Sequence, residues 1–334
     1  LTDTKIPAVV YYNGKVVDNA TVRVRGGDYS RTFYPKKSLK FELPKGYTID
    51  IGDEGEYLVD EFAIQADFGD WSQVTPDIAW DVFNAETDSF ESSFFVRAEI
   101  NGDFHGIFRY QNLYDGAYRD ATGISDDDEF FKAGGGAFGD TLSFDKKSPD
   151  DGDLTRLAQL NDVLVQSKSS AKTAYLYENV DIANVVNHMA LSVLMRHDDQ
   201  SGQNFYMLRD SETGLWSIVE WDLDRTFVVP SDGDGGSFTT PTPIKNELLN
   251  SVFEVPEFQE MYWRRMQTIV DKYLADDSLV TRHNELIEQI GASNSAAEFA
   301  KWGRNDIYSN RFWENEFADA IDLRRDAFAA ETRL

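Results

Sequence analysis

Between residues 196 and 227 the chain carries a spaced set of acidic and amide side chains inside an otherwise apolar frame. A polar run ends at Asn204, and two strand-like segments follow, the second of which leads into Trp-Asp-Leu-Asp at 221–224. If the two segments pair as an antiparallel hairpin, Asn204 and Asp222 come to the same end of it. Phosphoryl transfer uses such a set, with one carboxylate beside the attacking hydroxyl and an amide and a second carboxylate on a metal ion.

The polar run also fits the spacing of the protein-kinase catalytic loop, in which a His and an Asp are followed by four residues and an Asn. In that spacing Asp199 orients and deprotonates the substrate hydroxyl, Asn204 binds the metal ion, and His197 orients the loop by hydrogen bonding. Asp222 then completes the metal site, while Asp224, which shares its face if the strand continues, holds a second ion or anchors the loop. The alternative is that these carboxylates are solvated loop residues of an acidic protein.

A basic segment between residues 23 and 40 is the second candidate for binding, with six positive charges and a single opposing Asp. Arg25 opens an Arg-Gly-Gly turn whose backbone N–H groups can approach an anion. Lys36 and Lys37 precede a strand, where a lysine could hold nucleotide phosphates as a point charge. Strand alternation places these two lysines on opposite faces, so only a subset can point into a cleft. The alternative is a basic strand face that pairs with acidic neighbours.

Composition limits the partners. The 334 residues carry a formal charge of -27, which disfavours nucleic acid and anionic lipid, and no apolar run is long enough to span a membrane. Cysteine is absent, which excludes disulfides and thiolate metal sites. Leu1 to Lys5 do not resemble a signal peptide. The acidity indicates a salt-adapted surface or, alternatively, calcium binding near 231–236, although Pro243 stands where an EF-hand needs Glu.

The pattern of apolar residues predicts an α+β protein, with a β-rich part at 1–115 and a helix-rich part at 116–334 that contains the loop and hairpin. Asn13-Gly14 and Asn101-Gly102 each lie between strand-like runs and predict hairpin turns. The expected helices cover residues 75–83, 154–166, 182–195, 257–274 and 279–290, with two more between 296 and 330.

Several of these stretches together resemble the CotH kinase family, atypical protein kinases first associated with bacterial spore coats and also found among fungal surface invasins. The stretches are 22–27, 33–41, 101–108, 197–208 and 216–227, and they extend over about two thirds of the chain. The last two are the most specific, because they contain the loop and the Trp-Asp-Leu-Asp strand.

The resemblance implies a divergent, two-lobed protein-kinase-like fold that binds ATP with Mg²⁺ or Mn²⁺ and phosphorylates protein Ser or Thr. By position, Asp199 matches the family's catalytic Asp, Asn204 its loop Asn and Asp222 its metal-binding Asp. Lys37 matches a phosphate-contacting basic residue, and Lys132 another family lysine. The chain departs from the family at Asn112, where a Glu that could pair with a lysine is usual.

The expected function is therefore metal-dependent phosphorylation of a protein substrate, without nucleic acid or membrane insertion. The first alternative is a catalytically weak or dead kinase-like binding module of a secreted or cell-surface protein, which Asn112 favours and in which calcium could be bound. The second is a nucleotide-sugar transferase, because Asp222-Leu223-Asp224 could hold a metal and a diphosphate.

Overall fold

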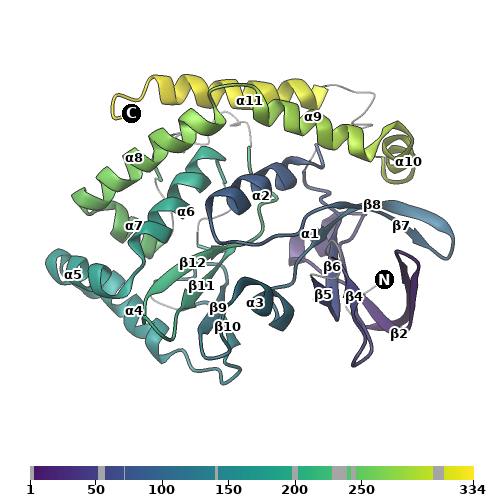
Figure 1. The fold of residues 1–334 in the computed structure, drawn as a ribbon, viewed down its shortest axis with the longest axis horizontal. Coiled ribbons are helices and arrows are strands. Elements are labelled where there is room, and N and C mark those ends of the chain that lie inside the picture. The colour runs from purple at the N-terminus through teal and green to yellow at the C-terminus, as the bar shows by residue number, and fades with distance from the viewer. Residues whose placement is uncertain are drawn as a thin grey trace. The chain divides into compact units, whose positions relative to one another are not determined.

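A computed structural model describes residues 4–51, 57–70, 72–139, 142–197, 202–227, 239–241, 246–303 and 312–334 of the chain. Helices and antiparallel strands occur throughout it, so the predicted α+β class is confirmed (Figure 1). Two predicted features, Asp199 and the acidic loop at 231–236, lie outside the described residues. No helix in the described part of the chain combines the length and the apolar character needed to cross a membrane.

Contacts divide the chain into two compact units, each built from separate stretches. The first unit comprises Leu1–Asp77, Phe90–Gly123 and His283–Glu314. The second comprises Ile78–Ser89, Ile124–Arg282 and Asn315–Leu334. The sequence-based division at residue 115 differs from these units, because it places the segment His283–Glu314 in the helix-rich part and the contacts group it with the β-rich unit. The two-lobed arrangement itself remains a prediction.

The first unit is built on a six-stranded antiparallel sheet with the strand order β1-β2-β3-β6-β8-β7. Its strands are β1 (Ile6–Tyr12), β2 (Lys15–Val24), β3 (Leu39–Glu42), β6 (Glu61–Gln65), β7 (Phe95–Ile100) and β8 (Asp103–Gln111). Both predicted Asn-Gly turns are confirmed, and all four turn residues have positive φ. Two-residue turns favour that backbone because its twist matches the twist of the paired strands.

One face of this sheet covers a hydrophobic core. Val22 and Val24 of β2 alternate with more exposed residues and pack with Leu39 and Ile64 of the neighbouring strands. The smaller elements of the unit are β4 (Ile49–Asp50), β5 (Leu58–Val59), α1 (Asp28–Phe33), α3 (Gly116–Thr122) and α10 (Ala292–Trp302). Helix α10 packs against β8, which explains how a C-terminal segment joins this unit (Figure 1).

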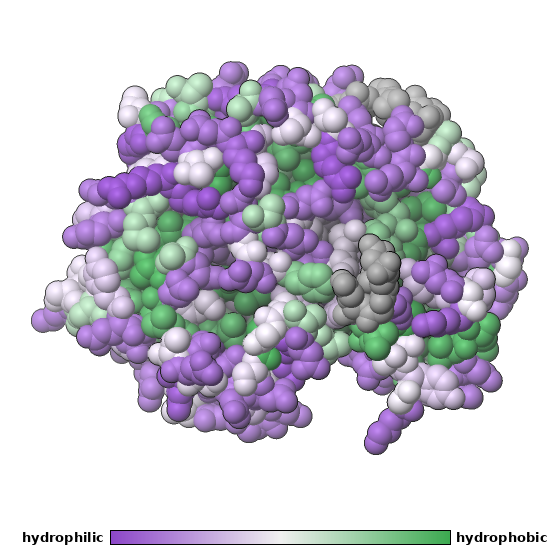
Figure 2. All heavy atoms as spheres, in the orientation of Figure 1, coloured by the Kyte–Doolittle hydropathy of each residue, from purple (hydrophilic) through white to green (hydrophobic). Residues whose placement is uncertain are grey.

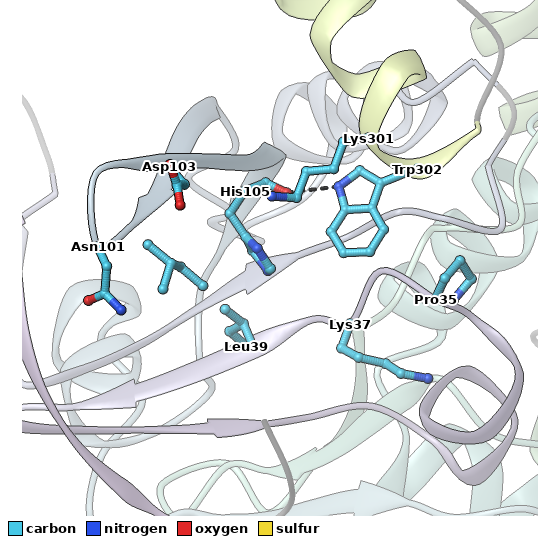
Figure 3. A pocket seen from close by; sticks show the side chains of 9 residues that line it. Pro35, Lys37, Leu39, Asn101, Asp103, His105, Lys301 and Trp302 are labelled. Atoms are coloured by element: carbon cyan, nitrogen blue, oxygen red, sulfur yellow. Dashed lines mark hydrogen bonds between the residues drawn. The ribbon is translucent and has the colours of Figure 1, made fainter.

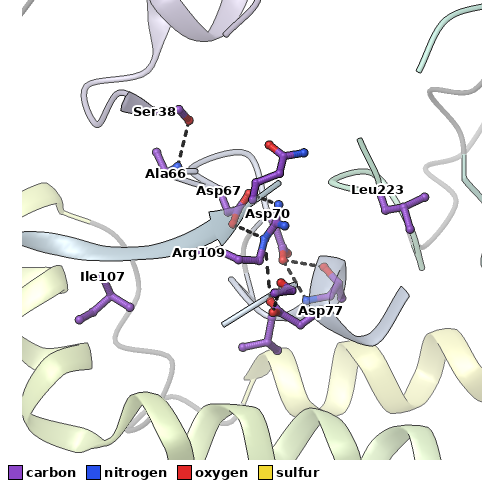
Figure 4. A network of polar contacts seen from close by, with 12 residues as sticks. Ser38, Ala66, Asp67, Asp70, Asp77, Ile107, Arg109 and Leu223 are labelled. Carbon is purple, nitrogen blue, oxygen red and sulfur yellow. Dashed lines mark hydrogen bonds and ion pairs between the residues drawn. The ribbon is translucent and has the colours of Figure 1, made fainter. Parts of the chain in front are cut away.

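A buried polar network holds the chain after β6 against β8 (Figure 4). The guanidinium of Arg109, 1% exposed, donates through Nε to Asp67 Oδ2 at 2.9 Å and through a terminal nitrogen to Asp67 Oδ1 at 3.2 Å. Its Nε also lies 3.9 Å from Asp77 Oδ2. Nearby, Asp70 accepts hydrogen bonds from the backbone N–H and the hydroxyl of Thr75 at 3.1 and 2.6 Å. The network therefore fixes the segment that leads into the next helix.

A second buried carboxylate lies beside this network. Glu91 is 4% exposed, and its Oε1 accepts a hydrogen bond from the backbone N–H of Asn112 at 2.9 Å. Burial raises the pKa of Glu91 to about 8, although the charge of Arg109 acts in the opposite direction. In the unfolded chain the same group titrates near its ordinary value of about 4.5.

The raised pKa of Glu91 makes the free energy of unfolding depend on pH in a defined direction. Between the two pKa values the folded state holds a proton that the unfolded state has lost, so stability falls as pH rises. Glu91→Gln stays neutral and is therefore expected to remove this slope between about pH 5 and pH 8. Urea unfolding of both proteins at several pH values across that window measures it, and equal slopes in the two proteins would contradict the assignment.

The second unit contains a four-stranded antiparallel sheet with the order β10-β9-β11-β12. Its strands are β9 (Glu129–Ala133), β10 (Phe144–Ser148), β11 (Phe205–Arg209) and β12 (Trp216–Glu220). The sequence predicts β11 and β12 but not the other two strands. The segment of β9 reads Glu-Phe-Phe-Lys-Ala, whose apolar residues do not alternate, and it lies between an acidic cluster and a glycine cluster that indicate loops.

The remaining helices are α2 (Thr75–Glu86), α4 (Thr155–Gln166), α5 (Ser169–Asn179), α6 (Ile182–Leu194), α7 (Glu247–Phe253), α8 (Pro256–Tyr273), α9 (Ser278–Ile290) and α11 (Phe312–Ala329). The predicted N-cap of α6 is confirmed, because the Asp181 side chain accepts a hydrogen bond from the Asn184 N–H at 3.0 Å. The Asn184 side chain in turn bonds both the N–H and the carbonyl of Ile218. Helix α6 is therefore fixed against β12.

Hydrophilic residues make up most of the molecular face in Figure 2, as the acidic composition predicts.

Candidate functional site

The predicted hairpin at the centre of the candidate site is confirmed. β11 and β12 pair antiparallel, with Phe205 opposite Glu220. This register brings Asn204, just before β11, and Asp222, two residues after β12, to the same end of the hairpin. Both side chains are partly exposed, so the chain presents an amide and a carboxylate to solvent at one end of this sheet.

The backbone at these two positions is left-handed. Asn204 has φ 61° and Asp222 has φ 62°, while Arg196 and Phe227 at the borders of the segment have φ 48° and 55°. Asn and Asp tolerate this conformation better than other side chains, and each such residue costs on the order of 1 kcal/mol. Residues held in this way concentrate at functional sites, where they aim a side chain that regular strand geometry would turn elsewhere.

Lys132 brings a positive charge to the same sheet end. It lies on β9 directly opposite Tyr206 of β11. Its Nζ is 4.6 Å from the centre of the Trp221 ring and 5.8 Å from that of Tyr206. Because Trp221 immediately precedes Asp222, the ammonium group belongs to the same neighbourhood as the predicted metal ligands. The sequence-predicted residues Lys132, Asn204 and Asp222 are therefore grouped in the second unit.

A buried carboxylate connects the strand to the start of the predicted catalytic loop. Glu220, the last residue of β12, is 1% exposed and lies two residues before Asp222. Its Oε2 is 3.0 Å from Nδ1 of His188 in α6, and its Oε1 is 3.7 Å from Nδ1 of His197. Glu220 is therefore a charged neighbour of His197, but 3.7 Å is too long for a hydrogen bond, and the predicted orienting role of His197 stays a prediction. Asp198 and Asp199 beyond it lie outside the described residues.

Hydrogen bonds from two other segments also fix the C-terminal end of α6. Arg324 of α11, also 1% exposed, donates to the carbonyl oxygens of Leu194 and Met195 at 3.0 and 3.3 Å. Burial and the nearby charge of Arg196 lower the pKa of Arg324 to about 9. The backbone N–H of Phe227 also donates to the Met195 carbonyl. The segment after Asp222 and Asp224 is therefore tied directly to the residues that precede the loop.

Removing the Glu220 charge tests this connection. Glu220→Gln keeps the size of the side chain but takes away the carboxylate beside the two histidines, so we expect a loss of about 1–3 kcal/mol in the free energy of unfolding. Glu212→Gln, at an exposed position in the β11–β12 turn, is the matched control and should change stability by less than about 0.5 kcal/mol. Urea unfolding of both variants measures the difference, and equal midpoints would show that the cluster contributes nothing.

The basic segment lies in the first unit, and its two lysines have different surroundings. The side chain of Lys36 is fully buried and its Nζ lies 2.6 Å from Glu298 Oε1 of α10. The same ammonium donates to the Ile107 carbonyl, while Glu298 Oε2 accepts from the Ile107 N–H at 2.8 Å. Lys37 is partly exposed and donates to the carbonyls of Ser30 and Arg31 at the end of α1. Lys36 therefore holds α10 on β8, whereas Lys37 remains accessible.

Arg25 and Asn112 both take part in the interior of the first unit. The Arg25 side chain donates to Gln111 Oε1 at 3.0 Å, and its backbone N–H bonds the Ser38 carbonyl. Asn112 is fully buried, and its Nδ2 donates to the Phe90 carbonyl at 2.9 Å. The amide that departs from the family pattern thus has a structural use here. A buried lysine–carboxylate pair does exist in this unit, with Glu298 supplying the carboxylate.

The residues present fit a hard divalent cation by their chemistry. Carboxylate and amide oxygens are the ligands that Mg²⁺ and Ca²⁺ prefer, and Asn204, Asp222 and Asp224 supply them at or next to one sheet end. Within the described ranges, no three acidic or histidine side chains gather as a ligand set. The predicted ligand set contains the amide of Asn204 and, among the described residues, only the carboxylates of Asp222 and Asp224, so it does not form such a group. The fit to a divalent cation therefore rests on the oxygen chemistry of these three side chains.

Four functional or supporting residues were missed by reasoning from sequence: His188, Glu220, Glu298 and Arg324. Glu220 had a usable signal, because an ionisable residue ends a mostly apolar strand. Glu298 had none, since it occupies one position of a helix with many small residues and its partner lies far away in sequence. Asp199, the predicted catalytic residue, is not placed, and Arg25, Lys36 and Lys37 belong to the other unit from Asp222.

The chain matches one known protein family over most of its length. A family model described as CotH kinase protein matches residues 22–323, a range that includes segments of both units. No curated protein matches the chain.

Proposed function

The chain belongs to the CotH kinase family, and from that premise we propose that it transfers the γ-phosphoryl group of ATP to serine or threonine hydroxyls of a protein substrate, with Mg²⁺ or Mn²⁺. One observation carries the proposal. The β11–β12 hairpin brings Asn204 and Asp222, both on left-handed backbone, to the sheet end where the Lys132 ammonium also lies. Oxygen ligands beside a fixed cation are what a metal–triphosphate complex requires.

Each residue has a distinct role in the proposed reaction. Asp199 orients the substrate hydroxyl and accepts its proton as the new bond from oxygen to the γ-phosphorus forms and the bond to the β-phosphate oxygen breaks. Asn204 and Asp222 hold the metal ion, with Asp224 as a further ligand or anchor. The bound ion supplies charge neutralisation on the phosphate oxygens. Lys132 contacts the phosphates, and Glu220 with His197 keeps the loop oriented.

The binding-module alternative rests on Asn112. The buried amide of Asn112 donates a hydrogen bond to the Phe90 carbonyl, which gives this residue a structural role. Lys36 and Glu298 form a buried lysine–carboxylate pair elsewhere in the unit. Both observations weaken the sequence argument for a dead kinase. A surface module that binds calcium in place of nucleotide stays the second candidate, because the acidic composition is unusual. The family's spore-coat and invasin members favour a secreted or surface location for either function.

Phosphate transfer and ligand-induced stabilisation test the proposal together. We expect the purified chain with γ-labelled ATP and Mg²⁺ or Mn²⁺ to label itself or casein, and EDTA to stop the reaction. ATP with metal should also raise the melting temperature, because a ligand that binds only the folded state stabilises it. Absence of label on either acceptor, combined with a melting shift from calcium alone, would favour the binding module.

A further inference from the structure

The first unit contains a pocket of about 540 Å³ that the proposed reaction does not use (Figure 3). Every described residue that lines it belongs to this unit. Trp302 and His105 form one wall, Leu39 and Ile100 add apolar surface, and Lys37 and Lys301 contribute charge. Its volume lies in the range typical of binding pockets.

The aromatic wall is fixed before any ligand arrives. The Trp302 indole N–H donates to the His105 carbonyl at 2.8 Å, and the two rings meet edge to face at 5.4 Å. The His105 ring also stacks on Phe108 at 5.8 Å. The adjoining buried pair of Lys36 and Glu298 holds α10, which carries Trp302, against β8. A rigid wall lowers the entropy that binding would cost.

The two lysines of the pocket differ from other lysines of this acidic chain. Lys40, for example, pairs with Glu61 at 2.7 Å. Lys37 donates to two backbone carbonyls and Lys301 to that of Phe104, and no carboxylate of the described residues pairs with either ammonium. Each lysine therefore keeps at least one N–H for a ligand. Figure 3 shows them extending from different sides of the pocket, with Trp302 between them.

The ring of His105 adds contact area without a competing charge. Burial and the neighbouring ammonium of Lys301 lower the pKa of His105 below its ordinary value, so the imidazole is neutral at neutral pH. Asp103 and Asn101 line the rim and are exposed, where their oxygens can accept backbone N–H groups. The pocket thus offers cations on two sides, an aromatic wall between them and acceptors at its edge.

We propose that this pocket docks a short acidic peptide segment of the protein substrate, with an aromatic side chain against Trp302 and His105 and flanking carboxylates on Lys37 and Lys301. Aromatic anchors and charge complementarity are the usual basis of such recognition. The net charge of the chain does not prevent it, because at physiological salt charges more than about 8 Å away are largely screened. The binding site stands on its own geometry, while its use for substrates rests on the proposed kinase function.

A fluorescent peptide with the core Asp-Phe-Asp, followed by a short linker and a serine, tests the site by anisotropy without ATP. We expect saturable binding that weakens with added salt, and much weaker binding of Asn-Phe-Asn and Asp-Ala-Asp versions. Lys301→Glu should reduce affinity about tenfold, since it reverses one contact charge. Lys15→Glu, at an exposed lysine of the same unit, makes the same change in net charge and should have no such effect.

The outcomes separate the two proposals. Equal binding of the Asn-Phe-Asn peptide, or equal losses from Lys301→Glu and Lys15→Glu, would overturn the pocket assignment even if casein is phosphorylated. Displacement of the peptide by saturating ATP with Mg²⁺ would also overturn it, because the pocket would then be the nucleotide site. If the wild-type chain binds the peptide but transfers no phosphate, the kinase proposal would be wrong and the pocket assignment would stand. If both hold, the Asp-Phe-Asp peptide should be phosphorylated with a lower KM than its Asn version.

Discussion

Asp222→Asn is expected to reduce phosphate transfer at least about 100-fold and to abolish the melting shift that ATP produces with Mg²⁺. The substitution removes a negative charge from the proposed metal ligands but changes the shape of the side chain very little. Asn also tolerates the left-handed backbone at this position, where φ is 62°. Stability without ligand should therefore stay close to wild type, and the loss would report on the site.

Two comparison variants sharpen this result. Asp145→Asn removes one charge from an exposed side chain on β10 of the same sheet and should leave both transfer and the ATP-induced shift unchanged. Asp199→Asn should abolish transfer but keep the shift, because its proposed role concerns the substrate hydroxyl and not the metal. If Asp222→Asn retained more than half of the wild-type transfer rate, the metal-binding role of this residue would be wrong.

The part of this site that sequence could predict depends on local patterns. The hairpin from Phe205 to Glu220 is readable because each strand has a short apolar run and the turn contains Gly214. Once the hairpin is assumed, the meeting of Asn204 and Asp222 follows from antiparallel pairing. The two Asn-Gly turns and the N-cap Asp181 are local in the same way, since their reason lies within a few residues of the chain.

The rest depends on contacts between segments far apart in sequence. Glu298 contacts Lys36 only when α10 packs against β8, and no sequence pattern near either residue predicts the pairing. The strand β9 is stabilised by β10 and β11 on its two sides and not by an alternating pattern of its own. The sequence predicts a glycine turn where the structure has α1, because two glycines precede its six residues and no side-chain cap marks its start. Tertiary packing, in each case, overrides the local signal.

The interior of the first unit should be most sensitive at Arg109. Arg109→Met keeps the apolar stem of the side chain but leaves the carboxylates of Asp67 and Asp77 buried without their cation. Breaking a buried ion pair by removing one partner costs about 3–5 kcal/mol, so we expect the free energy of unfolding to fall by that amount. Arg109→Lys should also be destabilising, since an ammonium cannot reproduce the two-pronged contact with Asp67.

Arg97→Met on the adjacent strand β7 provides the matched control. Arg97 pairs with Glu99, but its side chain is 46% exposed, and exposed pairs contribute about 1 kcal/mol or less. Urea unfolding should therefore separate the two arginines by at least about 2 kcal/mol. A similar small effect at both positions would mean that the carboxylates around Arg109 are satisfied without it. A large effect at Arg109 alone would show that the buried ion pairs of Arg109, and not pairing at the surface, fix the segment leading into α2.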